Sequence, residues 1–179
     1  MQLVLWLCCV TVLCATPASA CRASPRTPDL QAGVVTFQPP FVGQVFFTPT
    51  DGRRLRITGM VTGLPANNSL GVHVHEKGNL GNRCLDAGGH WNPFQRNHGD
   101  LGSSVRHEGD FGNLMTDSNG RMTFDLTVQT HPDDQTYGFI GLALVIHART
   151  DDLGRVGDAG SLATGNAGPR ITCGVIGRA

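Results

Sequence analysis

The sequence predicts an all-β protein, an antiparallel sandwich or flattened barrel, on the strength of three observations. About eight short segments carry strand signals, the 179 residues include 24 glycines, and no segment shows the 3.6-residue periodicity of a helix. Short strands separated by turn residues are typical of β-sandwiches and barrels. With 40% hydrophobic residues the chain can bury one core, so we expect a single domain.

The expected strands begin at residue 33 and are spread over the rest of the chain. They are 33–37, 42–47, 55–64, a strand containing 71–76, 111–116, 121–128, 138–147 and 171–178. The clearest is RMTFDLTV at 121–128, where apolar and polar residues alternate strictly, so one face is buried and one is wet. The preceding Asp117-Ser118-Asn119-Gly120 supplies turn residues, which predicts that 111–128 forms a hairpin.

Two long connections, from 77 to about 108 and from 148 to 170, interrupt this strand pattern. Loops of this length in a compact domain are usually functional or disordered. Both are rich in histidine, aspartate, glycine or arginine, so we expect them to carry function.

The first twenty residues are an apolar run ending in Ala18-Ser19-Ala20, the pattern of a removable signal peptide. The apolar part ends at Ala15 and is too short for a convincing membrane span, which disfavours a retained anchor. We therefore expect a signal peptide at 1–20, a flexible leader at 21–31 and the folded domain at 32–179. The product would be secreted and extracellular, or periplasmic in a bacterium.

Three cysteines remain after removal of the signal peptide: Cys21, Cys84 and Cys173. In an oxidising compartment Cys84 and Cys173, both within the folded region, are the natural disulfide pair. Cys21 is left over, and it could stay free, join two chains or carry a lipid.

The balance of charges and the low aromatic content argue against nucleic acid as a partner. Fourteen basic residues balance fourteen acidic ones, and aromatic residues make up only 6% of the chain. Neither a polyanion partner nor aromatic stacking on nucleic acid is indicated, so no nucleic-acid partner is expected.

Two histidines share one face of the strand GVHVHE. Side chains alternate along a strand, so His73 and His75 point one way while Val72 and Val74 point the other. His147 ends the strand LVIH and would join the two histidines if these strands are neighbours. Several imidazoles in a tetragonal arrangement suit copper(II).

The first long loop holds a second group of donors. His90, His98, His107 and Asp110 would make a four-coordinate zinc site with no open position, which is the structural kind. A copper and a zinc site need eight ligand places, but these groups supply seven donors once His131, an isolated histidine before Pro132, is set aside. One histidine would have to bridge the two metals.

Five motifs, in this order, give the chain a resemblance to a known family. GVHVHE, GGHWNP, RHEGDFGN, LVIHARTDDLG and TGNAGPRITCGVIG resemble copper,zinc superoxide dismutase of the secreted kind, over roughly residues 32–179. The resemblance implies an eight-stranded Greek-key sandwich, immunoglobulin-like, with two long functional loops. It implies copper ligands His73, His75, His90 and His147, and zinc ligands His90, His98, His107 and Asp110, with His90 as the bridge.

The same resemblance implies the activity. Superoxide would be converted to dioxygen and hydrogen peroxide by alternating reduction and oxidation of copper, while His90 takes up and returns a proton. Asp151 would orient one copper histidine and one zinc histidine, and Arg170 would attract and position the anion. The alternative is a noncatalytic copper-binding or copper-carrier module that keeps the fold.

Two departures from the family pattern affect the expected attraction of the superoxide anion and the expected homodimer. GDAGSLATGNAG lacks the glutamates and lysine that usually shape the guiding field, so steering rests on Arg170, helped by Arg149. The resemblance implies a homodimer, but Arg178 stands where the family interface usually has an apolar residue, and burying an unpaired charge is costly.

One sequon, Asn67-Asn68-Ser69, lies in a polar turn and is either glycosylated in a eukaryotic host or unused.

Overall fold

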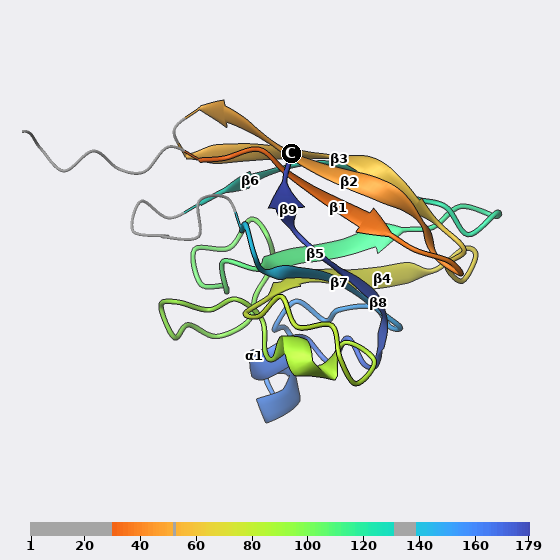
Figure 1. Cartoon of the computed structure of the whole chain (residues 1–179). Coiled ribbons are helices and arrows are strands. Elements are labelled where there is room, and N and C mark those ends of the chain that lie inside the picture. The colour runs from red at the N-terminus through yellow and green to blue at the C-terminus, as the bar shows by residue number, and fades with distance from the viewer. Residues whose placement is uncertain (1–29, 52, 131–138) are drawn as a thin grey trace, which may run out of the picture.

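Two antiparallel sheets face each other in the computed structural model, which describes residues 30–51, 53–130 and 139–179 (Figure 1). The first sheet has the strand order β6-β3-β2-β1-β9, and the second has the order β5-β4-β7-β8. The strands are β1 (Gly33–Phe37), β2 (Val42–Asp51), β3 (Arg54–Thr62), β4 (Ser69–His75), β5 (Asp110–Met115), β6 (Met122–Gln129), β7 (Ala143–His147), β8 (Arg170–Val175) and β9 (Gly177–Arg178). This arrangement confirms the predicted antiparallel sandwich.

The core lies between the sheets and follows the alternation of the strands. In β6, Met122 and Phe124 are buried and Asp125 is exposed, as the strict alternation predicted. In β4, Val72 and Val74 belong to the same core. The histidines between and after these valines are therefore directed to the outer side of the second sheet.

The predicted hairpin over 111–128 is wrong. The turn at Asp117–Gly120 exists, with the Gly120 N–H donating to the Asp117 carbonyl at 3.1 Å. Its two strands nevertheless enter different sheets, because β5 pairs with β4 whereas β6 pairs with β3. Only the bridge between Thr116 and Met122 remains of the expected ladder. The turn therefore carries the chain from one sheet to the other.

The last predicted strands are shorter than expected. The strand predicted at 138–147 begins only at Ala143, and its first residue lies outside the described part of the chain. The strand predicted at 171–178 is split at Ile176 into β8 and β9, which belong to different sheets. The described residues therefore contain nine strands where about eight were expected.

Two short helical segments lie in the long connections, where no helix was expected. The first connection contains a 3-10 turn, η1 (Leu85–Ala87), and the second contains α1 (Ala159–Thr164). The Asp158 carboxylate caps α1 by accepting from the Ser161 N–H at 2.7 Å, and Gly165 ends it in a left-handed conformation. A six-residue helix is too short to show helical periodicity in the sequence.

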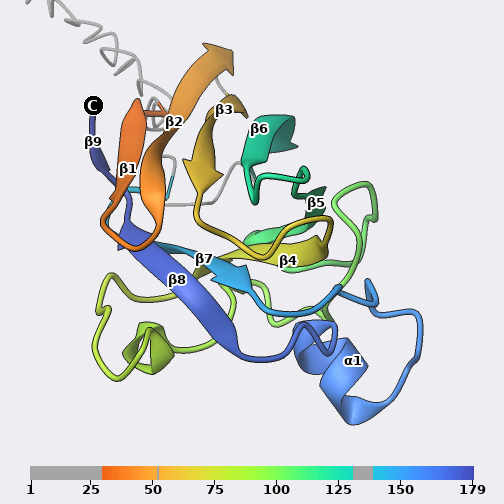
Figure 2. The ribbon, with the colours of Figure 1, turned by 90° about the vertical axis from the view of Figure 1, so that its right-hand side faces the viewer.

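Both long connections cover the outer face of the second sheet, on the side away from the first (Figures 1 and 2). Ala87 of the first connection packs there against Ala143 and Val145 of β7. The outer face of β4 and β7 is thus enclosed, which is where the histidines of these strands lie.

Some expectations fall outside the described residues. These are the signal peptide at 1–20, most of the leader at 21–31, Cys21 and His131. Within the part of the chain that is described, no helix has the length and hydrophobicity needed to cross a membrane.

Candidate metal centre

Three histidines meet because β4 and β7 are neighbours. His73 pairs with Val145 and His75 with Ala143, which brings His147 at the end of β7 onto the same face. His90 joins them from the first connection, where its backbone forms an isolated antiparallel β-bridge with His75. One ligand nitrogen from each of the four histidines lies within 4.8 Å of the others, and all four residues are buried.

Each of these four rings has one nitrogen held by the protein. The His73 Nε2 lies 2.8 Å from Asp151 Oδ2, and the His90 Nδ1 lies 2.9 Å from Asp110 Oδ1. The Nδ1 atoms of His75 and His147 lie 2.9 and 3.0 Å from the carbonyl oxygens of Gly88 and Gly168.

The other nitrogen of each ring belongs to a common cluster. His73 Nδ1 and His90 Nε2 are buried and have no hydrogen-bond partner among the described residues. His75 Nε2 and His147 Nε2 lie 3.2 Å apart. Orphaned buried nitrogens are costly unless something binds them, and four imidazoles suit copper. The residues present therefore fit a copper ion.

Burial keeps these rings neutral, as metal ligands must be. Loss of hydration lowers the pKa of His73 well below its ordinary value, and it lowers the pKa of His75 and His90 in the same direction. The pKa of His147 falls to about 4 for the same reason. At neutral pH each ring offers a free lone pair.

A second cluster is built around Asp110. Its Oδ1 lies 2.9 Å from the Nδ1 of His90, 3.0 Å from that of His98 and 3.2 Å from that of His107. Its Oδ2 is fixed by the backbone N–H groups of Gly99 and His107 at 3.1 and 2.8 Å. Three imidazole nitrogens and one carboxylate oxygen around one point fit a closed zinc site.

Distances alone leave another four-donor group open. Among ligand atoms that all lie within 4.8 Å of one another, the group around Asp110 contains His73, His90 and His98 but not His107. His73 has its Nε2 on Asp151, and its Nδ1 has no hydrogen-bond partner among the described residues. The Nδ1 of His107, in contrast, lies 3.4 Å from the Nδ1 of His90 and faces Asp110. Geometry thus favours His107 over His73 as the fourth donor.

Asp151 connects the two clusters. Its Oδ2 accepts from His73 and its Oδ1 accepts from the His98 Nε2 at 2.8 Å. Burial raises the pKa of Asp151, but the hydrogen bonds from both rings outweigh it, so the pKa lies below its ordinary value. For His98 the balance is reversed. Burial lowers its pKa, but the hydrogen bonds and negative charges of Asp110 and Asp151 have the larger effect and raise the pKa to about 9.

Several supporting residues were missed by sequence reasoning. Asn113 clamps the backbone of Asp151, because its Nδ2 donates to the Asp151 carbonyl and its Oδ1 accepts from the Asp151 N–H, both at 2.8 Å. Gly165 lies directly over Asp151 and His98, where a Cβ would come within 1.8 Å of Asp151 Oδ1. Both contacts join residues far apart in the sequence, so spacing gives no signal for them.

Arg170 lies beside the cluster of His73, His75, His90 and His147, which we call the copper-type cluster; the cluster around Asp110 is called the zinc-type cluster. A cavity of about 580 Å³ is lined by His75, His90, His147, Arg149 and Arg170 among others. The guanidinium donates through Nη1 to the Cys84 carbonyl and through Nη2 to the Gly88 carbonyl. A larger groove of about 730 Å³ lies on the outer face of the first sheet and is lined by no histidine.

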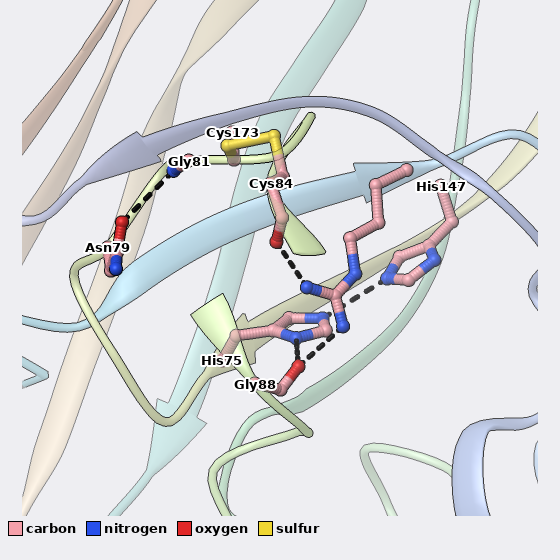
Figure 3. The surroundings of a disulfide bond; sticks show 8 residues. His75, Asn79, Gly81, Cys84, Gly88, His147 and Cys173 are labelled. Carbon is pink, nitrogen blue, oxygen red and sulfur yellow. Dashed lines mark hydrogen bonds between the residues drawn. A yellow bond between two sulfur atoms is a disulfide. The ribbon is translucent and has the colours of Figure 1, made fainter. Parts of the chain in front are cut away.

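The predicted disulfide between Cys84 and Cys173 is confirmed (Figure 3). It joins the first connection to β8 at the residue that pairs with Val145. Figure 3 also shows that the His75 and His147 rings face each other and that the Gly88 carbonyl contacts His75. The disulfide thus anchors the segment whose carbonyls hold Arg170.

Comparisons with known proteins agree with this geometry. The family model for copper/zinc superoxide dismutase matches residues 41–176. The extracellular Cu-Zn superoxide dismutase of Schistosoma mansoni is 49% identical over 138 residues, covering 77% of this chain and 74% of that protein. Its namesake from Caenorhabditis elegans is 43% identical over 136 residues, covering 76% and 61%. A solved structure, the clock protein EA4, superimposes with a TM-score of 0.76 at 38% identity, covering 88% of this chain and 99% of that one. The chain belongs to the copper/zinc superoxide dismutase family.

Proposed function

We propose that this chain is a secreted superoxide dismutase whose copper is held by His73, His75, His90 and His147. Two superoxide anions and two protons give one dioxygen and one hydrogen peroxide. The zinc ligands in this proposal are His90, His98, His107 and Asp110. The observation that carries the assignment is the pair of buried, unpartnered nitrogens, His73 Nδ1 and His90 Nε2, beside a cavity that contains an arginine.

Bound copper supplies the one-electron chemistry of both half-reactions, and bound zinc supplies charge and a fixed geometry without redox chemistry. His90 would contribute a nitrogen to each metal site, because its Nδ1 faces Asp110 and its buried Nε2 has no hydrogen-bond partner among the described residues. The Nε2 of His90 is the atom at which the chain can hold a proton and hand it on. His90 would thus take part in both sites and act as the proton carrier.

Arg170 attracts the anion and orients it in the cavity. Its guanidinium keeps its direction because two of its nitrogens donate to the carbonyls of Cys84 and Gly88. Arg149 lines the same cavity and adds a second positive charge. Positive charge in a partly closed cleft raises the local concentration of an anionic substrate.

The test uses residues 21–179, loaded with copper and zinc. We expect one copper ion and one zinc ion per chain, and a rate of superoxide decay well above the background rate. His147→Ala should lose copper and activity, whereas Gln44→Ala, an exposed change on the first sheet, should keep both. Wild type that binds both metals yet leaves superoxide decay at background would instead identify a noncatalytic copper-binding module.

The domain organisation is part of the proposal. Residues 1–20 are removed on export, 21–31 form a leader and 32–179 form the catalytic domain. The start of β1 at Gly33 supports this boundary, and two animal relatives named extracellular support secretion. The mass of the protein secreted by a eukaryotic host tests it, since cleavage after Ala20 predicts a chain that begins at Cys21.

A charge at one end of the sandwich opposes self-association. The family resemblance suggests a homodimer, but Arg178 in β9 is exposed and would have to be buried by association at this end of the sandwich. We propose that self-association is weak for this reason.

A further inference from the structure

We propose that Asn67 is a site of N-linked glycosylation, an inference that rests on the proposed secretion. Asn67-Asn68-Ser69 is the one Asn-X-Ser/Thr triplet in the sequence, and its middle residue is not proline. Asn67 and Asn68 lie in the turn between β3 and β4 and are both exposed, and Ser69 begins β4. Such modification occurs on surface loops of secreted proteins.

The two neighbouring asparagines differ in what their side chains do. The Asn68 Nδ2 donates to the Ala66 carbonyl at 2.6 Å. The carboxamide of Asn67 makes no hydrogen bond to the described residues. The structure thus leaves free the amide nitrogen that the triplet designates as the acceptor.

The backbone of the turn is independently fixed, so a large substituent on Asn67 would not disturb it. The Asn67 N–H donates to the Asp117 carbonyl at 3.1 Å, and the Asn68 N–H donates to Thr116 Oγ1 at 2.9 Å. Asn67 has a φ of 53°, a left-handed conformation that asparagine tolerates better than most residues. These bonds use the backbone and leave the Asn67 side chain in solvent.

The modification is a group transfer from a polyprenyl-diphosphate-linked oligosaccharide. The Asn67 Nδ2 forms a bond to C1 of the first N-acetylhexosamine, and the bond from C1 to the diphosphate oxygen breaks. The diphosphate leaves with the bonding electron pair, and the amide nitrogen loses one proton. Nothing is oxidised or reduced.

The position of Asn67 leaves the metal centre accessible. Ser69 begins β4 and His75, which lines the cavity, ends it, so about 20 Å of strand separates the triplet from His75. None of the residues that line the Arg170 cavity belongs to the β3–β4 turn. A glycan at Asn67 should therefore leave the rate of superoxide decay unchanged.

The experiment expresses the full chain in insect or mammalian cells and maps the secreted protein by peptide mass spectrometry. In the wild type, peptide N-glycosidase should remove a glycan and convert Asn67 to aspartate. Asn67→Asp and Ser69→Ala should abolish the modification, while Ser69→Thr should keep it, since threonine also completes the triplet. Copper and zinc content and superoxide decay should match across all four chains.

A second arm separates this proposal from the proposed secretion. The same chains, with residues 1–20 replaced by a signal peptide of established efficiency, enter the secretory pathway whatever the native leader does. Failure of the native leader to export the chain would count against secretion alone. An unmodified Asn67 in the chain exported by the replacement leader would overturn the glycosylation site.

Discussion

The imidazole of His73 donates from Nε2 to Asp151 Oδ2 at 2.8 Å, and both side chains are fully buried. The second oxygen of the same carboxylate accepts from His98. One carboxylate therefore couples a ring of the copper-type cluster to a ring of the zinc-type cluster. Partners of metal-ligating histidines of this kind fix the orientation of the ring.

Asp151→Asn should weaken zinc retention about 10- to 100-fold. An amide keeps one acceptor oxygen but presents its NH₂ group to the other ring, where two donors then face each other. Zinc release to a colorimetric chelator measures the effect. Asp125→Asn is the matched control, because Asp125 is an exposed carboxylate paired with Arg56. Equal release from both variants would show that Asp151 does not hold the site.

Ser161→Ala should loosen α1 over the metal centre. The Ser161 hydroxyl donates to Asp152 Oδ1 at 2.7 Å and accepts from the Gly157 N–H at 3.2 Å. Leu162 in the same helix accepts from the His98 N–H at 2.8 Å. Loss of these two hydrogen bonds costs about 1 kcal/mol or more, so amide exchange at His98 should quicken about fivefold or more. Thr164→Ala, which removes an exposed hydroxyl from α1, is the control. Unchanged exchange at His98 in Ser161→Ala would contradict the coupling.

Arg170→Glu should slow superoxide decay about tenfold or more at low ionic strength and reverse its dependence on salt. Added salt screens attraction in the wild type, which lowers the rate, but screens repulsion in the variant, which raises it. Arg53→Glu makes the same charge change in the β2–β3 turn and should leave the rate near the wild-type value. A salt dependence of unchanged sign in Arg170→Glu would remove Arg170 from substrate attraction.

The metal-free chain should lose stability as the pH falls from 6.5 to 4. The pKa of His147 is about 4 in the fold and 6.5 in the unfolded chain, so in this window the unfolded state binds the proton and the folded state does not. This histidine alone accounts for roughly 3 kcal/mol. Urea unfolding at a series of pH values measures it.

His147→Gln tests the origin of that slope. A side chain that does not titrate should make the dependence of the free energy of unfolding on pH shallower between 6.5 and 4, and the lowered pKa values of His73, His75 and His90 account for the slope that remains. His98 acts in the opposite direction, because its pKa is raised to about 9 and its contribution is lost as the pH rises through that value. An identical slope in the variant would contradict the assignment to His147.

Arg178→Ile should strengthen self-association by about tenfold or more in the dissociation constant, because an interface at β9 then buries no unpaired charge. Sedimentation velocity over a range of protein concentrations gives the constant. Arg121→Ile, an exposed change in the β5–β6 turn, controls for added hydrophobicity. Equal dissociation constants for wild type and Arg178→Ile would show that Arg178 does not limit association.

Local alternation allowed the sequence to predict much of the fold and the face on which the site lies. Val72 and Val74 are buried in the core, and His73 and His75 lie opposite them, because adjacent side chains of a strand must point to opposite faces. The pairing of Cys84 with Cys173 also followed from the sequence, since these are the two cysteines of the folded region.

Tertiary packing decided what local pattern could not. The residues Asp117–Gly120 form a turn in either arrangement, but the partners of β5 and β6 depend on β4 and β3, which precede them by tens of residues. Arg170 is held by the carbonyl of Cys84, 86 residues away, and Asn113 holds Asp151 across 38. Backbone carbonyls are the same in every residue, so only the folded path of the chain determines which of them a side chain meets.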